Sequence, residues 1–292
     1  MRFVLCKSML LTGEQLSVSS FGSRLLEVFT KQGHLCIGID PSAEQLSSWS
    51  LPVSAQGARA FSLEILDAAA GNVGLVKLQV AFFEQFGPEG FRVLAEVLEL
   101  AQSRELLVIA DAKRGDIGST MAGYARAWLS KEALFVCDAV TVSPYLGAES
   151  LAESVSVALS NKRGIFVLAA TSNPEATVVQ SSMSGDKSVA SRALSFAGSF
   201  SEGDLGSVGV VVGATVQAQE VGLDFNQVLG FPVLVPGFGS QGAQFLGARA
   251  LLAAYSDVSL CSSSRAIAGS SREGLAERVS KAKAELEVGL RA

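Results

Sequence analysis

The chain has 292 residues, of which 49% are hydrophobic and only 17% are charged, and its formal net charge at pH 7 is −5. This length and apolar content suffice for one large domain or two small ones, and they suit an α/β protein whose sheet is buried on both faces. The negative charge, without a cluster of Lys and Arg among aromatic residues, argues against a nucleic-acid partner.

The chain opens on MRFVLCKSMLL, an apolar stretch that Lys7 interrupts and that no small-residue cleavage site follows. It is therefore not expected to act as a secretory signal. Residues 1–18 are expected to form a poorly constrained N-terminal arm, followed by a single domain over residues 19–292. No segment reaches the length of a membrane span. The expected location is the cytoplasm, because the cysteine pattern indicates a reducing compartment.

The cysteines lie far apart, in or beside apolar runs, and no two form a C-x-x-C pair. They are Cys6, Cys36, Cys137 and Cys261. We expect them to be small buried side chains in a reducing compartment. The single histidine, His34, has no neighbouring residue of a metal-ligating type, which argues against a zinc site.

Taken in order, the chain repeats a short apolar run, a polar or glycine-containing turn, and an amphipathic stretch. The eight apolar runs cover residues 34–40, 73–80, 106–113, 139–144, 164–172, 208–215, 232–239 and 258–265. After the second run the pattern is helical, because Phe91, Leu94, Val97 and Leu98 fall on one face. Eight strands alternating with helices predict a (β/α)8 TIM barrel. The alternative is a doubly wound open sheet, although the G-x-G-x-x-G turn that often follows its first strand is absent.

The third run ends in a concentration of charge. In LLVIADAKRGDIGST, residues 106–120, the apolar residues give way to Asp111, Lys113 and Asp116. Residues two apart on a strand point to one face, so Asp111 and Lys113 are expected to project together, with Asp116 in the loop beyond. Such an array is costly to desolvate, which favours a functional role. Taken alone, the motif is equally consistent with a solvated loop that carries incidental ion pairs.

Nearly every predicted strand carries a polar residue at or near its C-terminal end, where barrels build their active sites. These residues are Asp40, Lys77, Asp111, Lys113, Thr141, Ser143, Ser172, Thr215, Gln241 and Arg265. Their gathering at one rim favours an enzyme. Lys77, in the middle of LVKLQV, by itself favours a simpler interpretation, an edge or rim residue whose ammonium reaches water.

Two late segments predict a phosphate site. VPGFGSQGAQ places Gly237, Gly239 and Gly242 around Gln241, so backbone N–H groups can approach an anion and the following helix can present its positive end. SSSRAI then supplies Arg265, with several hydroxyls before it. The loops after strands seven and eight are the common phosphate site of this fold. The alternative is a glycine-rich turn and an arginine that merely starts a helix.

Seven segments, in this order, closely resemble orotidine 5′-phosphate decarboxylases, in particular the bacterial subgroup typical of mycobacteria and their relatives. They are GIDPS, VKLQVAFFEQFG, DAKRGDIGST, TVSPYLG, TSNPEA, VPGFGSQGA and SSSRAI, within roughly residues 20–285. The resemblance implies a (β/α)8 barrel without cofactor or metal, and a homodimer with its sites at the interface. The implied reaction converts orotidine 5′-phosphate to uridine 5′-phosphate and carbon dioxide.

The resemblance also implies roles for single residues. The implied catalytic array is Lys77, Asp111, Lys113 and Asp116. The implied substrate contacts are Asp40 on the ribose, Ser172 on the pyrimidine, Gly239, Gln241 and Arg265 on the phosphate, and Thr120. Asp116 and Thr120 are implied to reach into the site of the neighbouring subunit. Leu78 and Ala170 depart from the family, which often has proline and arginine there, but both lie outside the charged array.

The reaction explains why these residue types are needed. Loss of carbon dioxide from C6 of the pyrimidine leaves an sp² carbanion with little delocalisation, so a fixed cation beside C6 must stabilise it. We assign this role, and the donation of the product proton, to Lys113. Asp111 and the partner's Asp116 would hold Lys113 and Lys77 in place and charged.

Other functions on the same barrel stay open: a non-catalytic nucleotide or sugar-phosphate sensor, a sugar-phosphate decarboxylase, and an aldolase. A sensor would have no reason to keep charges that are costly to bury. A magnesium-dependent sugar-phosphate enzyme would want a further carboxylate cluster. A Schiff-base aldolase needs a lysine that is readily neutral, whereas carboxylates flank Lys113.

Overall fold

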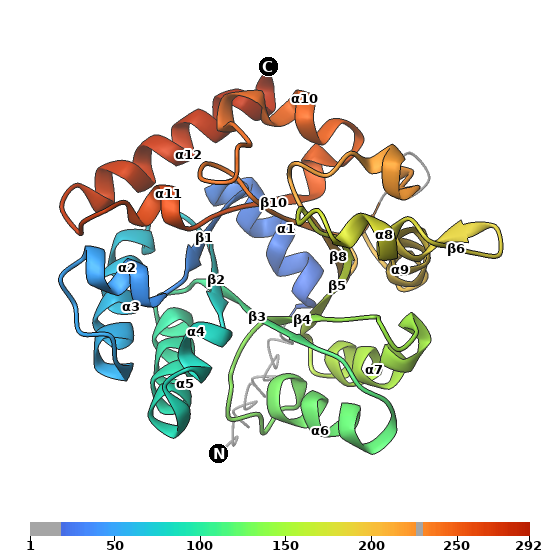
Figure 1. The fold of residues 1–292 in the computed structure, drawn as a ribbon, viewed down its shortest axis with the longest axis horizontal. Coiled ribbons are helices and arrows are strands. Elements are labelled where there is room, and N and C mark those ends of the chain that lie inside the picture. Colours follow the sequence, from blue (N-terminus) through green and yellow to red (C-terminus); the bar gives the residue numbers. More distant parts are fainter. Residues whose placement is uncertain (1–18, 226–229) are drawn as a thin grey trace, which may run out of the picture.

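Eight parallel strands close into a barrel in the computed structural model, which describes residues 19–225 and 230–292 (Figure 1). The strands are β1 (Leu35–Ile39), β2 (Leu75–Gln79), β3 (Leu107–Arg114), β4 (Ala139–Val142), β5 (Gly164–Ala170), β8 (Val208–Val212), β9 (Val233–Pro236) and β10 (Ser259–Ser263). They pair in that order, and β10 pairs with β1, so the sheet has no free edge. The predicted (β/α)8 barrel is confirmed, and the doubly wound alternative is wrong. Each apolar run of the sequence coincides with one of these strands, and only β3 extends past its run, by one residue.

The strands are buried on both faces, as their continuous apolar sequences predict. Every residue of β1, LCIGI, and of β8, VGVVV, is buried. One face contributes to a core inside the barrel, where Ile109, Phe166 and Leu234 lie. The other face packs against the surrounding helices in a second, larger core. The strands can therefore contact solvent only at the two ends of the barrel.

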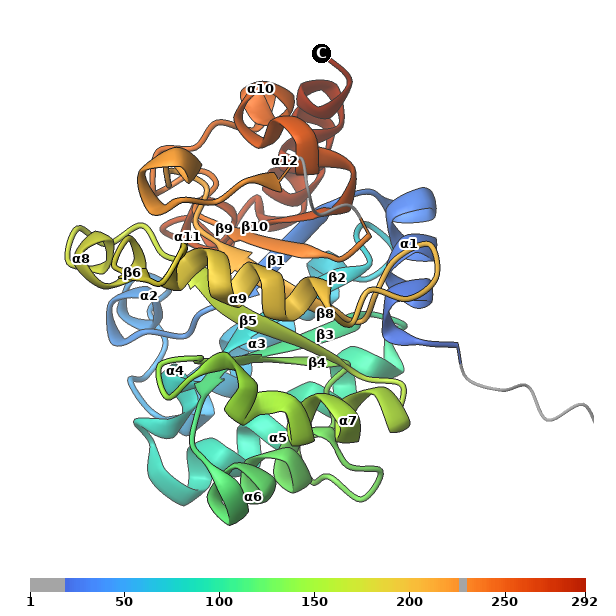
Figure 2. The ribbon, with the colours of Figure 1, turned by 90° about the vertical axis from the view of Figure 1, so that its right-hand side faces the viewer.

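Helices follow the strands in alternation and cover the outside of the barrel (Figure 2). The α-helices are α2 (Ala43–Ser48), α3 (Ala55–Ala69), α4 (Ala81–Glu84), α5 (Gly87–Ser103), α6 (Gly118–Leu129), α7 (Ala152–Ser160), α8 (Ala176–Gln180), α9 (Val189–Gly198), α10 (Ala248–Leu252), α11 (Arg265–Ala268) and α12 (Leu275–Arg291). Short 3-10 segments are η1 (Ala148–Leu151), η2 (Ala218–Val221), η4 (Phe245–Gly247) and η5 (Ala253–Val258). In α5, Leu94, Val97 and Leu98 form the buried face that the periodicity predicts. A hairpin of β6 (Met183–Ser184) and β7 (Lys187–Ser188) precedes α9.

One more helix, α1 (Phe21–Gln32), lies across the end of the barrel at which the strands begin (Figures 1 and 2). Phe21 and Leu25 belong to the core inside the barrel, and the Phe21 ring meets Phe166 edge-on, with centroids 6.0 Å apart. Gly164 permits this contact, because a Cβ there would lie 2.3 Å from the Phe21 ring. This end is therefore sealed, and the open end is the one where the strands finish.

The predicted arm, residues 1–18, lies outside the described residues, and so does Cys6. The division into an arm and one domain therefore stays a prediction. Cys36, Cys137 and Cys261 are buried free thiols, as expected. Across residues 19–225 and 230–292, no helix is long and apolar enough to cross a membrane.

Candidate active site

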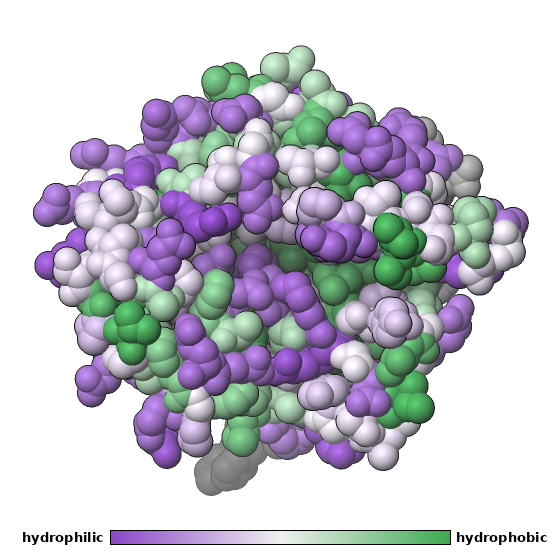
Figure 3. Space-filling model, in the orientation of Figure 1, coloured by the Kyte–Doolittle hydropathy of each residue, from purple (hydrophilic) through white to green (hydrophobic). Residues whose placement is uncertain are grey.

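A cavity of about 210 Å³ opens at the C-terminal ends of the strands, where the space-filling view shows a polar hollow (Figure 3). The lining residues predicted from the sequence are Asp40, Lys77, Asp111, Lys113, Ser172, Gln241 and Arg265. The others are Gln79, Leu168, Thr171, Val211, Gly213, Leu234, Pro236, Gly237, Phe238, Ser240, Ser262, Ser263 and Ser264. Ser143 and Thr215, which the sequence also placed at strand ends, do not line it.

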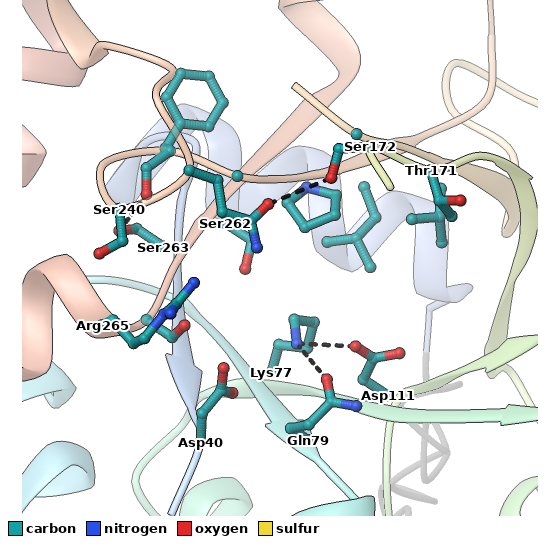
Figure 4. A pocket seen from close by; sticks show the side chains of 18 of the residues that line it. Asp40, Lys77, Gln79, Asp111, Thr171, Ser172, Ser240, Ser262, Ser263 and Arg265 are labelled. Carbon is teal, nitrogen blue, oxygen red and sulfur yellow. Dashed lines mark hydrogen bonds and ion pairs between the residues drawn. The ribbon is translucent and has the colours of Figure 1, made fainter. Parts of the chain in front are cut away.

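The cavity has two chemically different sides (Figure 4). On one side, the charged groups Lys77, Asp111 and Lys113 come from β2 and β3. Apolar side chains come from β5, β8 and β9, namely Leu168, Val211 and Leu234. A ligand with a flat, weakly polar ring and an anionic substituent matches such a pair of walls.

Asp111 lies at the centre of the charged side. Its Oδ2 is 3.0 Å from Lys77 Nζ, and its Oδ1 is 2.6 Å from Lys113 Nζ. The Thr141 hydroxyl also donates to Oδ1, at 2.8 Å. Asp111 is thus in direct contact with both lysines, and because it is 9% exposed at the end of β3, the interpretation as a solvated loop is wrong for Asp111.

Gln79 completes the surroundings of Asp111. In the orientation that satisfies both ends of its amide, Nε2 donates to Asp111 Oδ2 at 2.6 Å and Oε1 accepts from Lys113 Nζ at 3.3 Å. The opposite orientation would place the amide oxygen against the carboxylate and the amide nitrogen against the ammonium. The Asp111 carboxylate then has four donors for its two oxygens, which is its full accepting capacity. Gln79 was not predicted from the sequence, although its position two residues after Lys77 places it on the same face of the strand.

Lys77 is buried, with only 5% of its surface exposed, so its interpretation as a rim residue reaching water is wrong. Burial alone would lower the pKa of Lys77, but the Asp111 and Asp40 carboxylates outweigh it and raise that pKa above its usual value. Burial alone would raise the pKa of Asp111, but Lys77 and Lys113 outweigh it and hold that pKa well below its usual range. Both shifts favour the charged forms, so Lys77 and Asp111 form an ion pair.

Lys113 has an unusual backbone. The pairing of β3 with β4 shifts register between Ala110 and Arg114, and Lys113 lies in this irregularity with φ of 48°. A left-handed conformation in a residue other than glycine costs about 1–3 kcal/mol and persists only where its surroundings hold it. The predicted meeting of Asp111 and Lys113 is confirmed, but a bulge aims the lysine, where the sequence suggested regular strand alternation.

Asp40 follows β1 and points toward the cavity (Figure 4). Its Oδ1 is buried and has no hydrogen-bond partner among the described residues. Buried acceptors are nearly always paired, so a donor from a ligand is the natural partner of this oxygen. The chain comes close here, because a Cβ on Gly38 would lie 2.5 Å from Ser264 Cβ.

The predicted anion-binding residues lie on another part of the rim. Arg265 is the first residue of α11 and stands across the cavity from Asp111 (Figure 4). Gln241 Oε1 accepts a hydrogen bond from the Ser172 hydroxyl at 3.5 Å, which links the loop after β9 to the loop after β5. The Arg265 guanidinium thus lies on the opposite side of the cavity from Asp111.

The glycine-rich loop serves the site differently from the prediction. Gly239 does not line the cavity, but its φ is 79° and a Cβ there would lie 2.4 Å from Ala266 Cβ, so it lets the loop pack against α11. The expected helix after the loop is only the 3-10 segment η4, and none of its residues lines the cavity. The expectation that this helix presents its positive end to an anion is therefore wrong.

Asp116 and Thr120 do not line the cavity of their own chain. Asp116 accepts a hydrogen bond from the backbone N–H of Ile117, and Thr120 is exposed near the start of α6. Within the described residues, no group of three His, Cys, Asp or Glu side chains is arranged to hold a metal ion.

Fold and site together define a (β/α)8-barrel protein with a charged cavity at the catalytic end of its strands. Residues 33–278 match the model of the orotidine 5′-phosphate decarboxylase / HUMPS family. The orotidine 5′-phosphate decarboxylase of Corynebacterium glutamicum is 45% identical over 229 residues, which cover 76% of this chain and 81% of that protein. The enzyme of the same name from Corynebacterium efficiens is 46% identical and is covered to 80%.

A solved structure agrees with these relatives. The crystal structure of a candidate orotidine 5′-phosphate decarboxylase from Streptomyces avermitilis matches with a TM-score of 0.88 at 39% identity, covering 95% of this chain and 98% of that one. The chain therefore belongs to the orotidine 5′-phosphate decarboxylase / HUMPS family, and it is a carboxy-lyase. The family and the subgroup predicted from the motifs are confirmed.

Proposed function

We propose that the protein decarboxylates orotidine 5′-phosphate to uridine 5′-phosphate in pyrimidine biosynthesis. The observation that carries the proposal is the contact of Asp111 with both Lys77 and Lys113 beside an apolar wall. That arrangement offers a fixed cation to a ring placed against Leu168, Val211 and Leu234. The relatives from Corynebacterium carry the name of this activity.

In the proposed reaction the bond between C6 and the carboxylate breaks, and its electron pair remains on C6 while carbon dioxide leaves. Lys113 stabilises the developing carbanion, because a charge that is held in place before the reaction interacts favourably with the charge that forms. The Lys113 ammonium then gives a proton to C6, and the amine takes a proton from water after product release. Asp111 and the partner subunit's Asp116 keep Lys113 and Lys77 in place and charged.

The remaining residues are proposed to hold the substrate. Arg265 and Gln241 take the phosphate, Asp40 accepts from the ribose hydroxyls, and Ser172 contacts the pyrimidine, with Gly239 shaping the phosphate loop. The unpaired Asp40 Oδ1 supports the ribose contact. Binding of the phosphate, which is distant from C6, supplies binding energy that can lower the activation barrier at C6.

The reaction is proposed to need no cofactor and no metal. The test is to purify the protein without a metal-affinity tag, add a chelator, and follow the loss of orotidine 5′-phosphate absorbance. Full activity in chelator is expected. Activity that depends on an added divalent cation would overturn the cofactor-free proposal, and no turnover under any condition would overturn the function.

The proposal includes a cytoplasmic location, which the free thiols of Cys36, Cys137 and Cys261 support.

We further propose a homodimer in which Asp116 and Thr120 serve the neighbouring site. Both lie outside their own cavity, and the side chains around them form an exposed apolar surface. Ile117 is 59% exposed, Tyr145 81% and Leu146 52%. The two loops that carry these residues are adjacent, because the backbone N–H of Ser143 donates to the carbonyl of Arg114 at 2.8 Å. Such a surface suits an interface between copies of the chain.

Mixing two inactive variants tests the shared site. In a mixed dimer of Lys113→Ala with Asp116→Ala, one site inherits both defects and the other is intact. With random exchange of equal amounts, about a quarter of the parent activity is expected to return, because half the dimers are mixed and half their sites are intact. If native mass spectrometry of tagged chains shows exchange and activity stays at the level of the separate variants, Asp116 serves its own subunit.

A further inference from the structure

Thr141 of β4 is completely buried behind the charged array and does not line the cavity. Its hydroxyl donates to Asp111 Oδ1 at 2.8 Å and accepts from the backbone N–H of Lys113 at 2.9 Å. One oxygen atom therefore contacts both the central carboxylate and the peptide group that carries the lysine. This link joins β3 to β4 where their register breaks.

The position of this hydroxyl matters because Lys113 has a strained backbone. With φ of 48°, the residue adopts a conformation that L side chains seldom take, and such conformations relax unless neighbouring groups hold them. A hydrogen bond from the Lys113 N–H fixes the orientation of the peptide before the lysine. That orientation decides the direction in which the side chain leaves the strand.

The same hydroxyl also places the acceptor of the lysine. Lys113 Nζ lies 2.6 Å from Asp111 Oδ1, the oxygen to which Thr141 donates. Lys77 and Gln79 contact the other oxygen of Asp111. Among these partners of Asp111, Thr141 alone also bonds to the backbone N–H of Lys113. It therefore influences the lysine at its backbone, directly, and at its ammonium, through Asp111 Oδ1.

We infer that Thr141 is a positioning residue of the reaction, which holds the Lys113 backbone in its left-handed conformation and fixes the Asp111 oxygen that orients the ammonium. The inference rests on the proposed role of Lys113 and adds a residue that touches no substrate. The competing explanation is that Thr141 is a buried hydroxyl whose hydrogen bonds only stabilise the local structure. Ser259 of β10 is an example of that kind, since it is also completely buried and donates only to the carbonyl of Tyr255, at 2.7 Å.

Two substitutions separate these explanations. Thr141→Val keeps the shape and removes both hydrogen bonds, whereas Thr141→Ser keeps the hydroxyl. We expect Thr141→Val to lower kcat by about 10- to 100-fold, the effect of a small misplacement of a reacting group, with KM within about threefold of the parent. Thr141→Ser is expected to retain kcat within about threefold. Ser259→Ala, which removes a buried hydroxyl far from the cavity, is the matched control and is expected to leave kcat unchanged.

Thr141→Val leaves the buried N–H of Lys113 unpaired, which can lower the fraction of folded protein. The values of kcat are therefore expressed per binding-competent site, and these sites are counted by calorimetric titration with uridine 5′-phosphate. A Thr141→Val protein with kcat within threefold of the parent would overturn the inference, and so would an equal loss in Thr141→Ser. If Thr141→Val does not fold, Thr141→Ala replaces it with the same expectation. Failure of both to fold, with normal Thr141→Ser, would assign Thr141 to folding and also overturn the inference. Parent turnover tests the proposed function separately from all of these outcomes.

Discussion

The two ends of the barrel each bury a carboxylate, and the two are used in opposite ways. Asp138, just before β4 at the sealed end, is 6% exposed, and Asp111 at the open end is 9% exposed. Asp138 forms an ion pair with Arg24 of α1, accepts from Val108 N at 2.8 Å, and has Gln102 at 3.4 Å. Its partners tie α1, β3 and α5 together, and none of them faces the cavity.

At the open end, three of the four side-chain partners described for Asp111 are themselves available to a ligand. Lys77, Gln79 and Lys113 all line the cavity, and the Lys113 side chain is 43% exposed. The same type of buried charge therefore holds elements together at one end and presents cations at the other. This is the division that a barrel allows, because residues at the C-terminal ends of strands carry chemistry and those at the N-terminal ends carry stability.

The largest expected effect is that of Lys113→Ala at the open end. It removes the stabiliser of the developing charge and the proton donor together, so kcat should fall by roughly 10³-fold or more. The melting temperature and the affinity for uridine 5′-phosphate should stay close to those of the parent. Steady-state kinetics and calorimetry measure both, and a variant that keeps more than a few per cent of parent activity would refute the assignment.

At the sealed end the expected loss is in stability. Asp138→Ala leaves the Arg24 guanidinium without its ion-pair partner and the Val108 N–H unpaired, so the free energy of unfolding should fall by about 3–5 kcal/mol. Its kcat, measured at low temperature on folded protein, should match the parent. Asp67→Ala, which removes an exposed partner of Arg104, is the control and should change stability by less than about 1 kcal/mol. Denaturant unfolding measures the free energy of unfolding of both variants. If Asp138→Ala lowered kcat without lowering the free energy of unfolding, the proposed difference between the two ends of the barrel would be wrong.

Within the open end, Arg265→Ala should act on binding more than on chemistry. Loss of the proposed phosphate contact should lower kcat/KM by roughly 100-fold, mostly through KM, because a charge-assisted hydrogen bond contributes about 1.5–3 kcal/mol. Added phosphite should restore part of the rate with a substrate that lacks its phosphate. Arg249→Ala, which breaks a surface ion pair with Asp257, is the matched control. An unchanged KM together with no phosphite activation would show that the anion binds elsewhere.

The smallest expected effect belongs to His34 at the sealed end, where its ring stacks on Phe29 and Nδ1 meets the carbonyl of Ser259 at 2.9 Å. Burial lowers the pKa of His34, although the Ser259 carbonyl and Asp257 oppose this. Because the folded pKa lies below the unfolded value, the unfolded chain binds more protons in the interval between them. The free energy of unfolding should therefore fall as the pH drops through about 6.5, and activity should not follow it.

This slope is measurable because His34 is the single histidine of the chain. Unfolding of a tag-free protein is compared with His34→Phe, which keeps a ring on Phe29 and does not titrate. The variant should show a shallower dependence on pH between 7.5 and 5.5. Equal slopes in the two proteins would show that His34 is not responsible.

The sequence predicted the eight strands and the cavity-facing groups Asp40, Lys77, Asp111 and Lys113, because parallel strands end at one rim and periodicity fixes their faces. It did not predict the bulge at Lys113, since a register shift depends on pairing with a distant strand. Lys77 was mistaken for a rim residue when taken alone, because its burial depends on counter-charges from β1 and β3. The role of Thr141 was missed for a similar reason, since its hydroxyl acts on another strand.

The seal made by α1 has a consequence for the order in which the chain assembles. The backbone N–H of Gly22 donates to the Ser207 hydroxyl, 185 residues away, and Arg24 meets Asp138, 114 residues away. During synthesis α1 is made well before these partners, and contacts between distant residues form slowly. Although α1 precedes all eight strands of the barrel, it is therefore among the last elements to dock, and until then its apolar side, with Phe21 and Leu25, has no barrel to enter.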